Sequence, residues 1–331
     1  MAGRRRKKSG GRSYAWRYRG RIVACVFVEV IIICALVIMI GWNKGVKEWF
    51  EQFEQPVLKE VDISGINSPN AILMQAREGK ILGEINGEAQ IYPASMTKIM
   101  TVILGIENFD DLDEKITLTD EMFAGLYEQD ATQAGFQPGE EVRVIDLLYG
   151  AMLPSGAECC IALADTISGS EADFAELMNK KARKLGMENT HFCDSTGLHN
   201  PDHYSTVKDI AVLMKYCIKN DTFREIVETS RHSTGVTNIH PDGITYYSTM
   251  FKNLSDPTVT GGKILGGKTG YTSEAGHCLV SFAEIEGREY IFVSAGASGA
   301  DGNTIPHIQD AVTVYNRVGA AIEAKMNDNN K

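Results

Sequence analysis

Ser95 and Lys98 are separated by three positions at the start of an apolar stretch that predicts a helix over residues 96–107. This spacing places the hydroxyl and the amine on one helix face, where they can touch. A serine becomes a nucleophile when a neighbouring base takes its proton, and an amine can do so only when uncharged. Lowering a lysine pKa from about 10.4 to about 7 costs about 4.6 kcal/mol. Burial, a helix N-terminus and a second cation can together supply that energy.

The same spacing recurs at Ser205 and Lys208, so the pair of residue types does not by itself identify a catalytic site. Thr206 and Asp209 accompany the second serine, which is typical of a helix cap. Other residues must therefore distinguish the two positions.

A second candidate is Gly266-Gly267-Lys268-Thr269-Gly270. Residues 262–269 also satisfy the phosphate-loop pattern, but that motif requires a helix directly after it. Here a glycine-rich turn and then a strand are predicted, which disfavours nucleotide binding. A lysine and a threonine on a strand, flanked by a glycine that permits close backbone approach, indicate instead a site for a carboxylate.

Ser155 lies between Pro154 and Gly156, in a break between two predicted helices. Its hydroxyl either caps the helix that follows or passes a proton between Lys98 and a leaving amine. Both interpretations remain open on the residues alone.

Imidazole and carboxylate side chains are concentrated between residues 191 and 203; they are His191, Asp194, His199, Asp202 and His203. His199 and His203 have metal-ligand spacing only if they share a helix, and Pro201 prevents one there. Solvated loop residues are therefore the expected reading, with a metal site in a loop as the alternative.

The elements expected around these residues are an early hairpin, a central helical block and late strands. The pattern predicts strands at 71–75, 81–85, 116–119, 264–268, 278–284 and 290–295, and helices at 96–107, 144–152, 158–167, 171–185, 206–218 and 305–326. This order favours an α+β domain in which helices pack against an antiparallel sheet.

The ordered motifs Ser-x-x-Lys, Ser after Pro, and Lys-Thr-Gly on a late strand resemble the penicillin-binding and serine β-lactamase fold. The surrounding sequence is closer to the low-molecular-weight serine D-alanyl-D-alanine carboxypeptidases, peptidase family S11. The matching stretches are residues 93–98, 152–156, 192–198 and 266–272, and the resemblance covers about residues 63–325.

The resemblance implies that Ser95 attacks the D-Ala-D-Ala peptide bond of a peptidoglycan stem peptide and that Lys98 takes its proton. It implies that Ser155 helps to deliver the proton to the departing D-alanine. Water then hydrolyses the acyl-enzyme, and β-lactam antibiotics acylate Ser95 as substrate mimics. No metal or cofactor is implied.

The resemblance also implies a binding site formed by residues 268–271. Lys268 and Thr269 would hold the C-terminal carboxylate of the substrate beside Gly270. The backbone N–H groups of Ser95 and Tyr271 would form an oxyanion hole, a contribution of about 3–4 kcal/mol per donor.

The second motif departs from the family pattern, because Ser155-Gly156-Ala157 replaces the usual Ser-x-Asn. The amide that would contact Lys98 and the substrate is missing, while Glu158 is one residue late. We expect activity with an altered rate or specificity. The alternatives are a β-lactamase or D,D-endopeptidase of the same fold, and a catalytically impaired penicillin-binding sensor.

Charge is divided unevenly along the chain. Residues 1–21 hold nine Lys and Arg and no acid, which leaves 24 bases and 43 acids in the rest of the 331 residues. The chain after residue 21 is therefore strongly acidic. Its negative charge repels the phosphate backbone, which disfavours nucleic-acid binding by this part of the protein.

Residues 22–40 form an apolar run broken only by Glu29. Thirteen Ile, Val, Leu and Phe residues, at about −0.3 to −0.6 kcal/mol each, outweigh a penalty of about 3 kcal/mol for one charge. We therefore predict an uncleaved transmembrane anchor over residues 22–42 rather than a signal peptide. The basic flank, residues 1–21, would be cytoplasmic and the rest would lie outside. Glu29 either snorkels or marks a partner helix.

The remaining boundaries follow from composition. Residues 43–62 are predicted to be a stalk, residues 63–326 the catalytic domain and residues 327–331 a disordered tail. Five cysteines lie outside the span; they are Cys159, Cys160, Cys193, Cys217 and Cys278. Their odd number, the adjacent pair and the absence of a C-x-x-C motif suit no regular disulfide framework, so we expect small buried residues.

Overall fold

The computed structural model describes residue 30, residues 58–299 and residues 305–329. The chain divides into two compact units, Met1–Pro56 and Val57–Lys331, and the second carries the elements described below. The predicted basic tail and span fall outside the described residues, apart from residue 30. Among the residues that are described, no helix combines the length and the apolar character needed to cross a bilayer.

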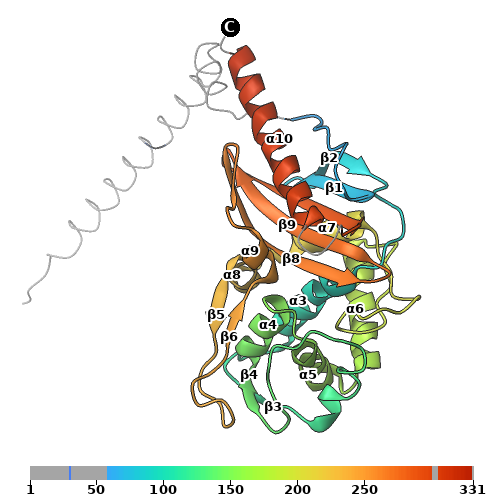
Figure 1. Cartoon of the computed structure of the whole chain (residues 1–331), viewed down its shortest axis with the longest axis vertical. Coiled ribbons are helices and arrows are strands. Elements are labelled where there is room, and N and C mark those ends of the chain that lie inside the picture. The colour runs from blue at the N-terminus through green and yellow to red at the C-terminus, as the bar shows by residue number, and fades with distance from the viewer. Residues whose placement is uncertain (1–29, 31–57, 300–304, 330–331) are drawn as a thin grey trace, which may run out of the picture. The chain divides into compact units, whose positions relative to one another are not determined.

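The centre of the unit is a six-stranded antiparallel sheet in the order β2-β1-β10-β9-β8-β7 (Figure 1). Its strands are β1 (Asn70–Gln75), β2 (Lys80–Ile85), β7 (Thr258–Val259), β8 (Gly262–Thr272), β9 (Gly276–Ile285) and β10 (Arg288–Ala297). The first hairpin therefore joins the last strand, since β1 pairs with β10 along its whole length. Two further pairs form small sheets: β3 (Lys115–Thr117) with β4 (Glu141–Arg143), and β5 (Arg231–Ser233) with β6 (Thr245–Tyr247).

Alternation along the strands gives the sheet two buried faces. On β1, Ile72 and Met74 belong to one apolar cluster, while Ala71 and Leu73 belong to the other. The first cluster contains the central helices, and the second contains the long C-terminal helix α10 (Pro306–Asn329), which crosses the opposite face of the sheet in Figure 1.

The helical block is built around a helix that is apolar on almost every side. This helix, α3 (Lys98–Asn108), follows the short 3-10 helix η1 (Ala94–Thr97), and its first eight residues are buried. The other helices are η2 (Asp120–Phe123), α4 (Val144–Met152), α5 (Ala157–Ser168), α6 (Glu171–Leu185), α7 (Val207–Cys217), α8 (Asp221–Glu228) and α9 (Thr249–Asn253). A helix with no polar face must be surrounded by protein. This explains the central position of α3.

The predicted α+β fold and its antiparallel sheet are confirmed, with differences at both ends of the domain. Leu58 and Val61 are buried against the sheet, and the Val61 amide donates to the Leu82 carbonyl. The stalk predicted for residues 43–62 is therefore wrong at its C-terminal end. The tail predicted from residue 327 is also misplaced, since α10 continues to Asn329.

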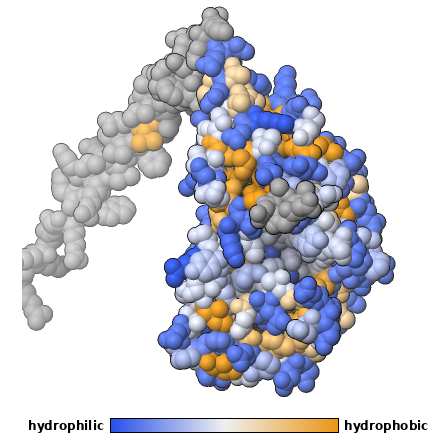
Figure 2. All heavy atoms as spheres, viewed as in Figure 1, coloured by the Kyte–Doolittle hydropathy of each residue, from blue (hydrophilic) through white to orange (hydrophobic). Residues whose placement is uncertain are grey.

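The five cysteines are all free; Cys193 is half-buried and the other four are buried. On the face shown in Figure 2, apolar residues form several small, separate areas among polar ones. Most of the large apolar side chains of the described residues are buried inside the domain, as is usual for a folded domain with a hydrophobic core.

Candidate active site

Ser95 and Lys98 meet at the junction of η1 and α3. The Lys98 Nζ lies 3.0 Å from the Ser95 Oγ, within hydrogen-bond distance. The side chain of Ser95 is half-buried, whereas Lys98 is only 4% exposed. The predicted contact between hydroxyl and amine is therefore present, and the apolar α3 supplies the predicted burial.

The Lys98 amine has a second partner, the backbone carbonyl of Thr196, to which it donates at 2.6 Å. Burial lowers the pKa of Lys98 from its usual 10.5, and neighbouring acidic groups oppose this shift only in part. The direction matches the requirement for a base, because a lower pKa increases the fraction of uncharged amine at neutral pH.

Ser155 is the link between the helical block and the sheet. It has a positive φ of 74°, a conformation that L-residues adopt at a cost. The N-cap of α5 is Gly156, with no side-chain cap, so the Ser155 hydroxyl does not cap that helix. It accepts instead a hydrogen bond of 2.9 Å from Lys268 Nζ. The geometry thus favours the chemical interpretation of Ser155 over the capping one.

Lys268 projects from the middle of β8 and is 1% exposed. Besides Ser155, its amine donates to the Thr269 carbonyl at 3.0 Å. Burial, and then the charge of Lys98, hold the pKa of Lys268 well below its usual value. Two amines thus share one low-dielectric region, where each disfavours the charge of the other.

The residues after Lys268 bring β8 against η1. A Cβ placed on Gly270 would lie 3.0 Å from the Ser95 backbone nitrogen and 3.2 Å from the Ala94 Cβ, so a larger residue would require η1 or β8 to shift by a few tenths of an ångström. The Thr269 hydroxyl lies 2.7 Å from the Thr249 hydroxyl at the start of α9. Tyr271 is 61% exposed. Nucleophile, base and strand therefore border one region, as predicted.

A sequence model of the D-alanyl-D-alanine carboxypeptidases, peptidase family S11, matches residues 57–299. The chain belongs to this family. It is 35% identical over 231 residues to D-alanyl-D-alanine carboxypeptidase DacF of Bacillus subtilis, covering 69% of this chain and 57% of that protein. It is 33% identical over 262 residues to DacC of Escherichia coli, covering 72% and 58%. The chain thus spans less than two thirds of the length of these relatives.

Solved structures agree with this assignment. The crystal structure of the Streptomyces K15 DD-transpeptidase superposes with a TM-score of 0.69 at 29% identity, covering 79% of this chain and 100% of that one. A D-alanyl-D-alanine carboxypeptidase from Mycobacterium tuberculosis has the same TM-score at 22% identity, covering 81% and 96%, and it supports the fold alone.

Two other motifs of the sequence, the phosphate-loop pattern and the second Ser-x-x-Lys pair, take other roles in this S11 domain. Residues 262–269 lie within strand β8, and another strand follows rather than a helix, so they form no phosphate loop. Ser205 is buried and its hydroxyl lies 2.8 Å from that of Thr190, while Lys208 pairs with Glu88. The cap of α7 is Thr206, which accepts from the Asp209 amide, so the predicted cap is present one residue further on.

The predicted loop of histidines and aspartates is held together by direct pairs. His203 Nδ1 lies 3.2 Å from Asp194 Oδ2, and His199 packs edge-on against Tyr92. Across the described part of the chain, no three His, Cys, Asp or Glu side chains are grouped as metal ligands.

Sequence reasoning missed the Thr196 carbonyl and Thr249. A backbone acceptor carries no signal in residue type, and Thr249 follows no motif. The position of Glu158 was also underestimated. It is fully buried, and its Oε1 accepts from the backbone amides of Ala134 and Gly135 at 2.6 and 3.0 Å. Beside the buried Ala157, Glu158 thus fastens the 131–136 loop to the second motif.

Proposed function

We propose that this protein is a membrane-anchored serine D,D-carboxypeptidase that removes the terminal D-alanine from peptidoglycan stem pentapeptides. The observation that carries the proposal is the 3.0 Å contact between Ser95 Oγ and Lys98 Nζ, beside the buried pair of Ser155 and Lys268. Membership of the S11 family supports the reaction type, and the acyl-enzyme would form at Ser95.

Acylation begins when the uncharged Lys98 amine takes the Ser95 proton as the oxygen attacks the carbonyl of the penultimate D-alanine. The negative charge on the tetrahedral intermediate would be met by the backbone N–H groups of Ser95 and Tyr271. Gly270 supports this arrangement, because its missing side chain lets β8 approach the Ser95 backbone. No metal ion is needed for these steps.

The leaving group must receive a proton and its carboxylate must be held. Ser155 is hydrogen-bonded to Lys268, so its hydroxyl can pass a proton to the nitrogen of the departing D-alanine. Burial lowers the pKa of Lys268 and so disfavours its ammonium form. A substrate carboxylate beside the amine would raise that pKa again and stabilise the ammonium. Thr269 adds a hydroxyl donor. A water molecule then hydrolyses the ester on Ser95 and regenerates the enzyme.

The outer edge of β8 offers a place for the rest of the stem peptide. Within the described residues, β7 pairs with β8 only at Thr258 and Val259, opposite Lys263 and Gly262. Just beyond these residues the Ile264 amide donates to the Pro257 carbonyl. We expect an extended peptide to add as a strand along β8 after this point, next to Lys268.

The proposed anchor is residues 22–42, with the N-terminus cytoplasmic and the catalytic domain outside, against the cell wall. Its support is the apolar run and the nine flanking bases. We expect the full chain to remain in membranes after alkaline extraction and its outer domain to be digested by protease added to the outer side. Release by alkaline extraction would contradict the anchor without touching the enzymatic proposal.

Fluorescent penicillin labelling, with D-alanine release measured beside it, tests the activity. Wild type should be labelled and should release D-alanine from a pentapeptide, whereas Ser95→Ala should do neither. Ser205→Ala is the matched control, because Ser205 has the same Ser-x-x-Lys context, and it should behave as wild type.

The alternatives give different results in the same assay. Labelling without D-alanine release would identify the impaired sensor that Ala157 permits. Rapid penicillin hydrolysis without D-alanine release would identify a β-lactamase. Labelling that persists in Ser95→Ala would show that the nucleophile is another residue.

A further inference from the structure

The Lys98 amine, which lies against the Ser95 hydroxyl, also donates a hydrogen bond to the Thr196 carbonyl. An uncharged amine has two protons and one lone pair. Because Lys98 Nζ donates one proton to Thr196 O at 2.6 Å, its rotation is restricted and the lone pair can turn toward Ser95 Oγ at 3.0 Å. The position of this backbone carbonyl therefore bears directly on the direction in which the Lys98 lone pair points.

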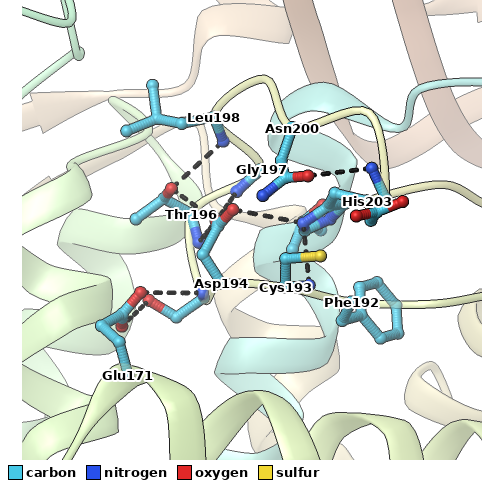
Figure 3. Close-up of polar contacts among 12 residues, drawn as sticks. Glu171, Phe192, Cys193, Asp194, Thr196, Gly197, Leu198, Asn200 and His203 are labelled. Carbon is cyan, nitrogen blue, oxygen red and sulfur yellow. Dashed lines mark hydrogen bonds and ion pairs between the residues drawn. The ribbon is translucent and has the colours of Figure 1, made fainter.

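One carboxylate holds the segment that carries this carbonyl. Asp194 Oδ1 accepts from the Thr196 amide, the Thr196 hydroxyl and the Gly197 amide, each at 2.7 Å (Figure 3). The Leu198 amide donates in turn to the Thr196 hydroxyl at 3.2 Å. Four polar contacts thus fold residues 194–198 into a tight turn around the Asp194 side chain.

The second oxygen of this carboxylate connects the turn to the catalytic helix. Asp194 Oδ2 lies 3.2 Å from His203 Nδ1, and His203 Nε2 lies 2.9 Å from Thr97 Oγ1. Thr97 directly precedes Lys98, so the contacts close a ring from Lys98 through Thr196, Asp194, His203 and Thr97. Such a ring fixes both ends of the hydrogen bond to the amine.

The ring is supported from its other side as well. The Ser195 carbonyl accepts from the Thr101 hydroxyl of α3 at 2.6 Å, and Ser195 Oγ donates to Glu171 of α6 at 2.6 Å.

The Asp194 carboxylate carries a negative charge in this ring. Burial alone would raise the pKa of Asp194, but the hydrogen bond and charge of His203 outweigh it and lower that pKa to about 2. The carboxylate is therefore ionised when the enzyme works.

We propose that Asp194, held by His203, is a positioning residue that aims the Lys98 lone pair at Ser95 by fixing the Thr196 carbonyl. The inference rests on the proposed function, since it assigns a role within the same acylation step. Asp194 and His203 do not touch the substrate; they act through a backbone group.

The proton on His203 follows from its partners. Both Asp194 Oδ2 and the Cys193 backbone amide face Nδ1, each at 3.2 Å. The Cys193 N–H can only donate and the Asp194 carboxylate can only accept, so the two contacts require opposite states of Nδ1. The charge-assisted bond to the carboxylate is the stronger of the two, so we infer that Nδ1 carries the proton and donates to Asp194. Nitrogen NMR of the His203 imidazole should show a protonated Nδ1 in wild type and a changed signal in Asp194→Asn.

The main test is the penicillin acylation rate of three full-length variants, each compared with wild type. In Asp194→Ala the carbonyl is released, and we expect acylation to slow about 100-fold with little change in noncovalent affinity. Asp194→Asn keeps an acceptor oxygen for the turn and should recover most of the rate.

The matched control is Asp310, a buried aspartate on the other face of the sheet, which accepts hydrogen bonds from both Asn67 and Ser68. Asp310→Ala should therefore unfold at lower temperature yet be acylated at the wild-type rate.

The pH profile of Asp194→Asn gives a readout that a purely structural role would not move. The titratable and polar side chains that face Lys98 are Ser95 from its own segment, Glu158, Cys159 and Cys160 from α5, Asp194, and Lys268 from β8. Removing the negative charge of Asp194 destabilises the Lys98 ammonium. The acid limb of the acylation profile should therefore move to lower pH.

Several outcomes would overturn the inference. They are a wild-type acylation rate in Asp194→Ala, an equal loss of rate in Asp310→Ala, and an acid limb that does not move in Asp194→Asn. If Asp194→Ala does not fold, the pH profile of Asp194→Asn decides. If the wild type is not acylated at Ser95 at all, the proposed function itself fails. If the wild type is acylated and Asp194→Ala is acylated at the same rate, only the positioning role of Asp194 fails.

Discussion

At the scale of single residues, the site depends on two amines in a region from which water is largely excluded. In the proposed mechanism, Lys98 must be uncharged to act as a base, whereas Lys268 must be charged to hold a carboxylate. Both side chains are almost completely buried, and burial lowers the pKa of each. The proposed substrate carboxylate would distinguish the two amines, because it stabilises the ammonium form of Lys268, the amine beside it.

The rate of penicillin acylation should rise with pH through the pKa of Lys98, with a midpoint below the usual lysine value of 10.5. The sign follows because deprotonation creates the active base. Stopped-flow measurement of the acylation rate over the neutral and alkaline range records this rise, the acid limb of the pH profile. Lys98→Arg should lose the limb and the activity, since a guanidinium stays charged. A midpoint at the ordinary lysine value would contradict the prediction.

Two substitutions of Ser155 separate the effect of its backbone strain on stability from the effect of its hydroxyl on the proposed reaction. Ser155→Gly and Ser155→Ala both remove the hydroxyl that contacts Lys268, so both should lose D-alanine release. Only glycine relieves the positive φ of 74°, so Ser155→Gly should be the more stable of the two by about 1 kcal/mol. Urea denaturation of the two proteins gives the difference. Equal stability would mean that the backbone there is not strained.

These residue-level features differ in how well the sequence could predict them. Ser95, Lys98, Ser155 and Lys268 were all predicted because a motif gives the spacing of the side chains. The Thr196 carbonyl was not predicted, since every residue has a carbonyl and only the fold brings this one to Lys98. The pairing of Asp194 with His203 was missed for a similar reason. A histidine near an aspartate in sequence is compatible with many loop conformations.

At the scale of elements, the turn of residues 194–198 must fit against η1 with little space between them. A Cβ on Gly197, whose φ is +80°, would lie 1.9 Å from the Ala94 carbonyl oxygen. The helix C-cap Gly186 has the same φ of +80° but nothing within 4 Å of its Cβ position. The two glycines therefore share a φ of +80° and differ in how closely other atoms approach their Cβ positions.

Gly186→Ala should destabilise the protein by about 1–2 kcal/mol through backbone strain, with no effect on acylation. Gly197→Ala adds a backbone collision and should be both less stable and about 100-fold slower in acylation. Thermal denaturation and penicillin labelling rates measure the two effects. Equal acylation rates in the two variants would show that the turn can move without disturbing Lys98.

Elements with strong periodicity or clear caps were predicted within a few residues, as the bounds of α4 and α6 show. The strand β8 was predicted too short, because its glycines mimic a turn, although they are what allows η1 to approach. The short elements α8, α9, β5 and β6 were not predicted. Segments of this length gain their stability from tertiary contacts rather than from local pattern.

At the scale of the whole molecule, the sheet separates the candidate active site on one face from the C-terminal helix α10 on the other. Ser95, Lys98 and Lys268 lie with the helical block, whereas α10 covers the opposite face through residues such as Val314 and Tyr315. The Tyr315 hydroxyl accepts from the Phe292 amide of β10 at 3.1 Å and lies 3.1 Å from Ser281 Oγ. This contact ties the last helix to the middle of the sheet.

Tyr315→Phe should lower the free energy of unfolding by about 1–3 kcal/mol, because a buried backbone donor loses its acceptor. Penicillin acylation at a temperature where the variant is folded should remain at the wild-type rate. Chemical denaturation and labelling measured on the same sample check both parts. A slower acylation rate would show that the two faces of the sheet are coupled.

The pairing of β1 with β10 joins strands from opposite ends of the domain, with Asn70 and Ala295 separated by 225 positions. During translation, the hairpin of β1 and β2 must therefore keep one open edge until β10, residues 288–297, has been synthesised. A nascent chain stopped before Arg288 lacks the strand that closes this edge, and an open strand edge is a template for self-association. Premature termination should thus yield aggregates rather than a smaller folded product.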